Sequence, residues 1–377
     1  MLVGGGHAHV HVLRSFGQAP VPGVRLVLVA RERHTPYSGM LPGLIAGHYR
    51  FEECHIDLAP LARFAGAELL HAAAVGFDRA AGRGLLDQGA PVGYDLLSLD
   101  IGITPALDAI AGASEHATPV KPISRFLDRW REVEARIVRA PGTFRLAVVG
   151  TGAGGVEVLL AARHRLGVLL AQRGGALDRL ACTLLGRRGV LPSHNPAVRR
   201  AFTRVLAERG VRVLGEAEVL AIEPDRVACR DGREVAADAV LLVTNARAPD
   251  WLRATGLALD RHGFVAVDAS LRSTGDPSVF AVGDVASVLP HPRPKAGVFA
   301  VRQGPPLARN LRLAAAGQEP EPFHPQHRFL SLITTGDRYV VGSRGGWKLE
   351  GRWLWRVKDR IDRRWMRQYQ ELPSARA

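Results

Sequence analysis

Two glycine-rich segments constrain what this chain of 377 residues can fold into. The first opens the chain as MLVGGGHAHVHVL, and the second, at 145–166, reads RLAVVGTGAGGVEVLLAARHRL. In each, a short apolar segment typical of a buried strand runs into glycines, and a helical pattern follows. This order of strand, glycine turn and helix is that of a βαβ unit that binds a dinucleotide.

The second segment carries the complete fingerprint. Gly150, Gly152 and Gly155 follow the GxGxxG spacing directly after the predicted strand. The first glycine permits a tight turn, the second lets a pyrophosphate approach the backbone, and the third lets helix and strand pack closely. Free N–H groups at the helix N-terminus then bind the anion. The alternative is a glycine-rich turn without a ligand, and the strand–helix context argues against it.

The first segment carries an incomplete fingerprint. Gly4 and Gly6 have the required spacing, but His9 occupies the position of the third glycine. We expect this imidazole either to loosen the packing of helix on strand or to reach the ligand. Together the two segments predict an α/β protein with two Rossmann-like dinucleotide-binding domains and a small C-terminal β-hairpin and helix segment.

The position after the next strand carries arginine in both units. An acidic residue there binds the ribose hydroxyls. In the first unit the strand VRLVLVA is followed by Arg31. In the second we predict GVLLAQR as the next strand, which ends at Arg173. An arginine at this position accepts the 2′-phosphate of NADPH, or it is a solvated arginine in an arginine-rich chain. Both interpretations stay open.

A third segment, VFAVGDVAS, places Gly283 and Asp284 directly after a short buried strand. An aspartate there can accept a hydrogen bond from a ribityl hydroxyl of a flavin. The following PKAGVFAVRQG contains Lys295 and Ala296 at a predicted helix start. A positive charge or a helix N-terminus beside the pyrimidine ring stabilises the reduced, anionic flavin.

The order of the two fingerprints, VTNARAP and VFAVGD resembles the pyridine nucleotide-disulfide oxidoreductase superfamily, with its type II NADH dehydrogenases and sulfide:quinone reductases. The strings GGGHAHVHVL, RHTPYSGMLPGLIAGHY, ECHIDL, SLDIG and KDRIDRRWMRQY resemble the subgroup that is fused to, or encoded with, selenide,water dikinase. The resemblance covers essentially the whole chain, whereas the kinase part is absent. It makes selenide,water dikinase a candidate partner.

This resemblance implies FAD in the first unit, NAD(P)H in the second, and hydride transfer through the flavin. The residues that it places at FAD are Gly4, Gly6, Arg31, Asp100, Gly102, Gly283 and Asp284. The residues that it places at NAD(P)H are Gly150, Gly152, Gly155 and Glu157. Asp100-Ile-Gly stands where most relatives carry Ala-Thr-Gly, a departure that bears on the hydrogen bonds at the crossover between the domains.

Departures from the family patterns narrow the electron acceptor. The chain has neither the CxxxxC nor the CxxC dithiol of the disulfide-reducing branch, and PKAGVFAVRQG lacks the cysteine of sulfide oxidases. Val298 and Arg302 occupy the glutamine positions of the quinone-facing AQxAxQxG motif. A quinone is the favoured small-molecule acceptor. The alternatives are a selenium or sulfur compound, or a flavin-binding scaffold subunit without turnover.

Two further side chains are candidates for chemistry. His7 and His11 share a helix face at the spacing of a metal pair. They lie where the pyrophosphate and flavin should bind, so we assign no metal site and place His7 beside the cofactor. Relatives have Glu157 near the nicotinamide or quinone. It either relays protons after hydride transfer or is an ordinary first-turn glutamate. Glu157 and Lys295 are the predicted catalytic residues.

Composition excludes several classes of protein. Hydrophobic residues make up 47% and charged residues 23%, as in ordinary globular proteins. We find neither an uncharged apolar stretch long enough to span a membrane nor an export leader, and the three cysteines form no disulfide or zinc pattern. The sequence therefore predicts a cytoplasmic protein. The first strand has so few residues before Gly4 that we expect the true start upstream.

The C-terminal segment concentrates positive charge and tryptophan. The net charge is +14, which reflects either a GC-rich genome or a basic surface, and we expect no nucleic-acid partner. Between Arg344 and Arg367 stand nine basic and three acidic residues and four of the six tryptophans. A basic amphipathic helix of this kind indicates peripheral membrane contact. Alternatively, its stripe of Leu354, Val357, Ile361 and Trp365 packs on the flavin domain or on a second subunit, which would make a homodimer.

These patterns divide the chain into four parts, with the FAD-binding domain discontinuous. The predicted boundaries are 1–118 for its first part, 119–245 for the NAD(P)H-binding domain, 246–325 for its second part, and 326–377 for a C-terminal interface or membrane-facing segment.

Overall fold

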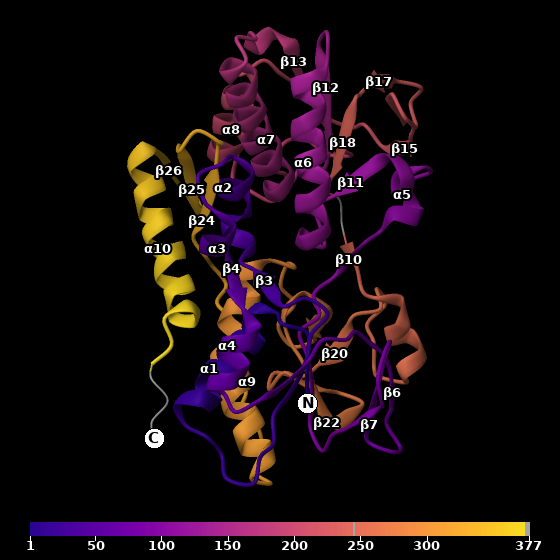
Figure 1. The fold of residues 1–377 in the computed structure, drawn as a ribbon, viewed down its shortest axis with the longest axis vertical. Coiled ribbons are helices and arrows are strands. Elements are labelled where there is room, and N and C mark those ends of the chain that lie inside the picture. The colour runs from indigo at the N-terminus through magenta and orange to yellow at the C-terminus, as the bar shows by residue number, and fades with distance from the viewer. Residues whose placement is uncertain (244–245, 374–377) are drawn as a thin grey trace.

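The computed structural model describes residues 1–243 and 246–373. It has two lobes, each built on a parallel sheet, with a C-terminal helix along one side (Figure 1). Thr244 and Asn245 of the VTNARAP segment lie outside the described residues. No helix in the described part of the chain is both long and apolar enough to cross a membrane.

The first lobe contains an eight-stranded sheet. Five of its strands run parallel in the order β22-β9-β1-β2-β5, and β21, β20 and β23 continue the sheet beyond β22. Each parallel strand is short and mostly apolar, as expected for strands buried on both faces. The strands are β1 (Leu2–Val3), β2 (Val27–Val29), β5 (Glu68–Leu70), β9 (Leu97–Leu99), β20 (Val265–Val267), β21 (Arg272–Ser273), β22 (Asp276–Ala281) and β23 (Ala286–Val288).

Successive side chains of these strands alternate between two covering layers. Leu2, Leu28 and Phe280 pack against α1 (His7–Gln18), α4 (Leu58–Phe64) and α9 (Gly297–Ala315). Val3, Val29 and Val279 face the antiparallel sheet of β6 (Ala74–Asp78), β7 (Arg83–Leu86) and β8 (Val92–Gly93). The sheet is thereby buried on both faces.

The second lobe repeats this arrangement. Its five parallel strands have the order β11-β18-β12-β13-β14, with helices on one face and a small antiparallel sheet on the other. The strands are β11 (Ala117–Pro119), β12 (Phe144–Val149), β13 (Leu180–Leu185), β14 (Val211–Leu214) and β18 (Ala239–Leu242). The covering elements are α6 (Ile123–Arg139), α7 (Ala153–Gln172), α8 (Pro196–Glu208), β15 (Val219–Ile222), β16 (Arg226–Cys229) and β17 (Glu234–Ala236). The predicted α/β class with two Rossmann-like domains is confirmed.

Short elements complete the chain. β10 and β19 pair antiparallel where the chain passes between the lobes. The remaining elements are β3 (His34–Pro36), α2 (Leu41–Ile45), α3 (Phe51–Cys54), β4 (His55–Asp57), β10 (Thr104–Pro105), α5 (Ala113–His116), β19 (Ala246–Arg247), and the 3-10 turns η1 (Ser38–Met40), η2 (Leu107–Ala109), η3 (Leu177–Arg179), η4 (Asp250–Thr255) and η5 (Gly283–Val285).

One sequence-based expectation needs correction. The segment GVLLAQR is the last part of α7 and not a strand, because the helix continues from Ala153 to Gln172. Near the predicted boundary at residue 118, Ala111 pairs with Ala221 of the second lobe and β11 begins at Ala117. The division into domains stays a prediction.

The C-terminal segment packs on both lobes. It consists of an antiparallel sheet of β24 (Ser331–Thr334), β25 (Val340–Arg344) and β26 (Trp347–Gly351), followed by α10 (Arg352–Gln370). Met366 and Tyr369 of α10 join the core of the first lobe, whereas Ile333 and Val341 join that of the second. The segment therefore connects the two domains.

One ion pair in α10 is almost inaccessible to solvent. Nζ of Lys358 donates to Oδ2 of Asp362 at 2.5 Å and to the carbonyl of Gly39 at 2.7 Å, and the two side chains are 9% and 6% exposed. Burial raises the pKa of Asp362, while Lys358 opposes that rise. Removing one partner of such a pair leaves an uncompensated buried charge.

We therefore expect Lys358→Met to lower the free energy of unfolding by about 3–5 kcal/mol. The double substitution Lys358→Met/Asp362→Leu should recover most of that loss, because it removes both charges. The control is Arg131→Met, which breaks the exposed pair of Arg131 with Asp128 and should cost less than about 1 kcal/mol. Denaturant unfolding measures all three, and equal losses for Lys358→Met and Arg131→Met would contradict the prediction.

Candidate functional site

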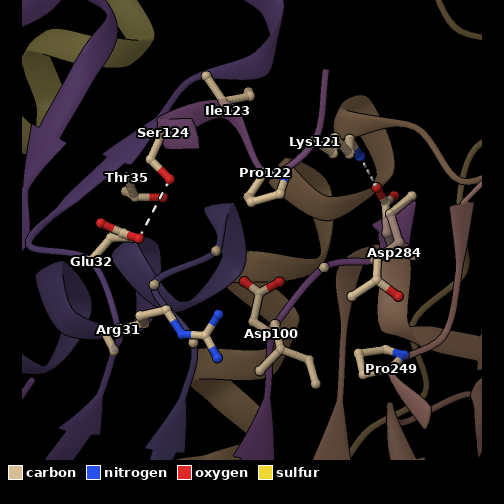
Figure 2. A pocket seen from close by; sticks show the side chains of 18 of the residues that line it. Arg31, Glu32, Thr35, Asp100, Lys121, Pro122, Ile123, Ser124, Pro249 and Asp284 are labelled. Atoms are coloured by element: carbon tan, nitrogen blue, oxygen red, sulfur yellow. Dashed lines mark hydrogen bonds and ion pairs between the residues drawn. The ribbon is translucent and has the colours of Figure 1, made fainter. Parts of the chain in front are cut away.

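A cavity of about 730 Å³ opens at the carboxyl ends of β1, β2 and β9. Residues Lys121–Arg125, which lead into α6 of the second lobe, complete its wall. Figure 2 shows Asp100 at its centre, Lys121 and Asp284 on one side, and Arg31 and Glu32 on the other. The carboxyl edge of a parallel sheet is where ligands bind in folds of this type.

The glycine turn at the cavity floor has no room for side chains. Gly4 has φ +94°, and a Cβ there would lie 2.3 Å from the carbonyl oxygen of Asp100. A Cβ on Gly6 would lie 2.2 Å from the carboxyl carbon of the same aspartate. Gly6 is the N-cap of α1 and supplies no side-chain cap. The first turn of α1 is therefore held directly against the end of β9.

Asp100 caps α1 from this neighbouring strand. Its Oδ2 accepts hydrogen bonds from the backbone N–H groups of Ala8 at 2.8 Å and His9 at 3.1 Å. Burial raises the pKa of Asp100 to about 7, and the two N–H groups oppose that rise. Asp100 stands where most relatives carry the alanine of Ala-Thr-Gly, and this difference places a carboxyl group at the N-terminus of α1.

His9 does not behave as we expected from the fingerprint. Its Nδ1 lies 2.7 Å from the carbonyl oxygen of Gly4, and its Nε2 lies 2.8 Å from Oγ of Ser98. The ring is fully buried, and burial lowers its pKa to about 4. The neutral imidazole fills the space between turn and sheet, so it neither loosens the packing nor points into the cavity.

His7 lines the cavity, and its predicted place beside the cofactor stays a prediction. Its Nε2 is buried and has no hydrogen-bond partner in the described part of the chain. Burial lowers the pKa of His7 to about 4, so the ring is neutral near pH 7. It packs edge-on against Tyr37 and against Trp365 of α10. A free polar atom at this point suits a polar ligand.

The wall of the cavity across from Arg31 and Glu32 carries charged side chains (Figure 2). Nζ of Lys121 lies 2.9 Å from Oδ2 of Asp284, which lines the cavity at η5. The ammonium of Lys295 lies 3.9 Å from the centre of the Phe264 ring and donates to the carbonyl of Ala286. Burial lowers the pKa of Lys295 to about 8. Ala296, the N-cap of α9, also lines the cavity and leaves that helix N-terminus without a side-chain cap.

Of the other residues predicted to contact the flavin, two line the cavity and one lies behind its lining. Arg31 and Gly102 line the cavity. Gly283 lies behind Asp100, because a Cβ there would be 2.7 Å from its Oδ1. Lys121 was missed from the sequence, since it precedes a helix of the other domain and no pattern marks it. Glu32 also lines the cavity, and its Oε1 accepts a hydrogen bond from Oγ of Ser124 at 3.4 Å.

The second fingerprint has the geometry expected of its three glycines. Gly150 has φ +133°, and a Cβ on Gly155 would lie 1.8 Å from the carbonyl oxygen of Gly150. Gly152 is the N-cap of α7 and faces open space, with no atom within 4 Å of an added Cβ. The turn is tight where helix and strand meet and open where a diphosphate would approach.

Arg173 does not belong to this site. It caps the C-terminus of α7, and the twenty residues of that helix separate it from Gly152, a length of about 30 Å. The strand after the fingerprint is β13, and it is followed by Arg187 and Arg188, both exposed. The carbonyl of Arg188 accepts a hydrogen bond from Oγ1 of Thr151 in the glycine turn. Sequence reasoning missed these two arginines because it placed the strand too early.

Glu157 is half-buried and lies outside the cavity lining. Its Oε1 accepts hydrogen bonds from the backbone N–H of Thr334 at 2.7 Å and from its Oγ1 at 3.1 Å. Burial raises the pKa of Glu157, and the nearby Lys358 opposes that rise. These contacts join α7 to the C-terminal segment. A catalytic role for Glu157 stays a prediction.

The geometry agrees with a match to known proteins. The family model for pyridine nucleotide-disulphide oxidoreductases matches residues 1–304. The chain belongs to this family. The family uses FAD and NAD(P)H, the two cofactors predicted from the sequence. Its members are oxidoreductases, which is the class of enzyme predicted for this chain.

Several proteins of known name are similar to the chain. An NADH dehydrogenase-like protein of Mycobacterium tuberculosis is 29% identical over 245 residues, which is 62% of this chain and 59% of that protein. A second, from Bacillus subtilis, is 23% identical over 299 residues, 77% of each chain. The ferredoxin–NAD(+) reductase component of a biphenyl dioxygenase system from Paraburkholderia xenovorans is 35% identical over 208 residues, 53% of this chain and 46% of that protein. The matches thus span about three fifths of the mycobacterial protein and about half of the ferredoxin reductase.

Solved structures show the same fold. The sulfide:quinone oxidoreductase of Aquifex aeolicus superposes with a TM-score of 0.82 at 18% identity, over 99% of this chain and 92% of that one. NDH2 of Plasmodium falciparum in complex with NADH superposes with a TM-score of 0.83 at 13% identity, over 99% of this chain and 98% of that one.

The second fingerprint generates a prediction about stability. Gly155→Ala forces a Cβ against the carbonyl of Gly150, so we expect the free energy of unfolding of the apoprotein to fall by about 1–3 kcal/mol or more. Gly154→Ala is the matched control, because its Cβ would lie an ordinary 3.5 Å from Cγ1 of Val243. It should be neutral or slightly stabilising. Urea unfolding distinguishes the two, and equal midpoints would contradict the account of this turn.

Proposed function

We propose that the protein is an FAD-dependent NAD(P)H oxidoreductase whose acceptor is a quinone. The observation that carries this proposal is the cavity itself. The N-terminus of α9, which has no side-chain cap, meets there with that of α1, whose N–H groups at Ala8 and His9 are capped by Asp100. Asp284 and Lys295 line the same cavity, and the second glycine turn opens on the adjoining lobe.

The residues of the cavity fit FAD from one end to the other. The turn from Gly6 to His7 presents free N–H groups of α1 to a diphosphate. Asp284 can accept a hydrogen bond from a ribityl hydroxyl, and its ion pair with Lys121 orients the carboxylate. The N-terminus of α9 and the ammonium of Lys295 supply positive charge for the pyrimidine end. Bound there, FAD supplies the hydride chemistry, while the chain supplies position and electrostatics.

NAD(P)H would bind the second lobe at the turn around Gly152. The two arginines after β13 favour a coenzyme that carries a 2′-phosphate, since no carboxylate stands there to bind a 2′-hydroxyl. Relatives named NADH dehydrogenase-like favour NADH. The proposal therefore covers both coenzymes.

The exposed face of α10 supports a quinone as the acceptor. Trp353, Val357 and Ile361 are 53%, 38% and 47% exposed, and Trp347 of β26 is 79% exposed. Only part of the stripe predicted from the sequence faces outward, because Leu354 is buried and Trp365 stacks on Tyr37. Alongside the apolar residues runs a column of exposed arginines, namely Arg352, Arg356, Arg360 and Arg364.

The acidic residues of α10 leave this column charged. Asp362 pairs with the buried Lys358 and not with Arg360, and Asp359 pairs with Arg363 at 2.9 Å. A face that combines tryptophan, aliphatic residues and unneutralised arginine is typical of peripheral contact with an anionic membrane. Quinones are lipid-soluble, so an enzyme held at a membrane surface meets its acceptor there.

A selenium or sulfur compound is the second candidate acceptor. Its support is the sequence resemblance to proteins encoded with selenide,water dikinase, together with Val298 and Arg302 in place of the glutamines. Catalysis through a protein thiol finds no support. All three cysteines, Cys54, Cys182 and Cys229, are buried, and burial raises the pKa of each thiol.

Flavin reduction tests the proposed function. The purified protein should be yellow, and NADH or NADPH should bleach it without oxygen. Gly152→Val should stay folded and yellow, because its Cβ faces open space. The larger side chain should block the diphosphate and slow bleaching about a hundredfold at subsaturating coenzyme, as a loss of about 3 kcal/mol of binding would. Wild-type protein that binds FAD but is reduced by neither coenzyme would support the scaffold alternative instead.

Membrane contact gives a separate prediction. Arg356→Glu/Arg360→Glu should weaken co-sedimentation with anionic vesicles by about thirtyfold or more, since each basic residue near the surface contributes about 1 kcal/mol. Arg131→Glu/Arg139→Glu on α6 is the control for the same change in net charge. Binding that is insensitive to salt and to the α10 substitutions would contradict the prediction. A dimer in solution that dissociates on Ile361→Glu would instead assign this face to a second subunit.

A further inference from the structure

The first turn of α1 already holds a carboxyl group where the diphosphate of FAD would bind. Oδ2 of Asp100 accepts from the N–H groups of Ala8 and His9, the second and third residues of the helix. The side chain also lines the cavity, where Figure 2 shows it centrally placed. We propose that Asp100 takes up one proton when FAD binds and that its neutral carboxyl group then donates a hydrogen bond to a phosphate oxygen. This inference rests on the proposed binding of FAD.

Like charge makes the ionised form of Asp100 incompatible with a diphosphate. Two negative groups that share a site do not both stay ionised, and one of them takes a proton. The diphosphate is the stronger acid, so the proton goes to Asp100. It comes from solvent, so no other reactant is required. The carboxylic acid keeps Oδ2 as the acceptor for both N–H groups and leaves Oδ1 free to donate.

In the described part of the chain no cation bonds to the Asp100 carboxyl group, although Arg31 lines the same cavity (Figure 2). From α1 it faces the neutral rings of His7 and His9, both with pKa values lowered to about 4 by burial. From η5 it faces Asp284, whose negative charge raises the pKa of Asp100 further. Lys121 is already paired with Asp284, and Lys295 donates to the carbonyl of Ala286. Because Asp100 has no ion pair of its own among the described residues, its negative charge is neutralised by a proton when the diphosphate binds.

The glycines around Asp100 show that the carboxyl position is built into the fold. A Cβ at Gly6 would overlap the carboxyl group, and a Cβ at Gly283 would lie 2.7 Å from Oδ1. Both glycines make room for this side chain as well as for a ligand. Asp100 cannot turn toward either of these backbone segments, so it stays at the helix N-terminus in contact with the cavity.

The pH dependence of FAD binding follows from this placement. In the free protein burial raises the pKa of Asp100 to about 7, and the bound diphosphate raises it further. Below pH 7 the group is protonated with and without FAD, so the affinity should be constant. Above pH 7 it must gain a proton on binding, so the Kd should rise by up to about tenfold per pH unit. Burial lowers the pKa of Lys295 to about 8, so this side chain loses its positive charge over the same pH range. That loss also weakens FAD binding as the pH rises.

Asp100→Asn separates these two contributions, because the amide is a neutral donor at every pH and Lys295 is retained. The experiment measures FAD binding to the apoprotein by quenching of flavin fluorescence from pH 6 to 9. Titration calorimetry in two buffers of different ionisation enthalpy counts the protons taken up. We expect wild type to take up close to one proton more than Asp100→Asn at pH 8, and its Kd to rise more steeply with pH.

A second variant and a second measurement distinguish the loss of the proposed hydrogen bond from misfolding of the variant. Asp100→Ala should take up as few protons as Asp100→Asn on binding FAD, but it should bind FAD more weakly because it cannot donate to the phosphate. In the apoprotein a carboxyl whose pKa is raised on folding loses stability as pH rises from about 4 to 7. The melting temperature of Asp100→Asn should therefore exceed that of wild type by an increasing margin over this range.

Equal proton uptake and parallel pH profiles for wild type and Asp100→Asn would overturn the inference and leave the proposed function intact. Folded Asp100→Asn that has lost FAD binding would also overturn it, since a required carboxylate would then be indicated. Absence of FAD binding by wild type and by both variants at every pH would overturn the proposed function and this inference together.

Discussion

The first turn of α1 lies so close to the end of β9 that neither Gly4 nor Gly6 has room for a Cβ. This contact brings the N-terminus of a twelve-residue helix to the carboxyl edge of the sheet, where β1, β2 and β9 all end. His9 then fixes the turn, because its buried ring bridges the carbonyl of Gly4 and the hydroxyl of Ser98. The cavity and its electrostatics depend on this arrangement, since the free N–H groups of the turn form its floor.

The C-terminal segment holds the two nucleotide-binding lobes in relation to each other. Glu157 in α7 of the second lobe bonds to Thr334 in β24, while Lys358 in α10 bonds to Gly39 of the first lobe. The same helix brings Trp365 against His7 at the cavity. Its outer face carries exposed tryptophan and arginine. One helix therefore connects the cavity wall, the contact between the domains and the surface proposed to meet a membrane.

The positions of the two glycine turns and of the Gly283–Asp284 turn could be predicted from the sequence, because each depends on local backbone geometry. Glycine spacing after a strand has few alternatives, and the structure places Gly4, Gly6 and Asp284 in one cavity. Arg173 was assigned wrongly for the opposite reason. GVLLAQR is a short apolar run, and periodicity alone does not distinguish a buried strand from the end of a long buried helix.

Contacts between distant segments were beyond prediction. Nothing local marks Lys121 as the partner of Asp284, which lies 163 residues away. Asp100 was identified as a departure from Ala-Thr-Gly, but its capping of α1 depends on the packing of β9 beside β1. The faces of α10 likewise depend on what the helix packs against. The spacing of Leu354, Val357 and Ile361 is helical, yet a buried charge pair takes part of the inward face.

A crystal structure of the protein with FAD would show where the flavin and its diphosphate bind. We expect the diphosphate at the first turn of α1, within hydrogen-bond distance of the backbone N–H of His7 and of the Asp100 carboxyl group. We also expect the ribityl chain beside Asp284 and the pyrimidine ring at the N-terminus of α9. FAD bound outside this cavity, or a diphosphate displaced from α1 with Asp100 still capping the helix alone, would contradict these expectations.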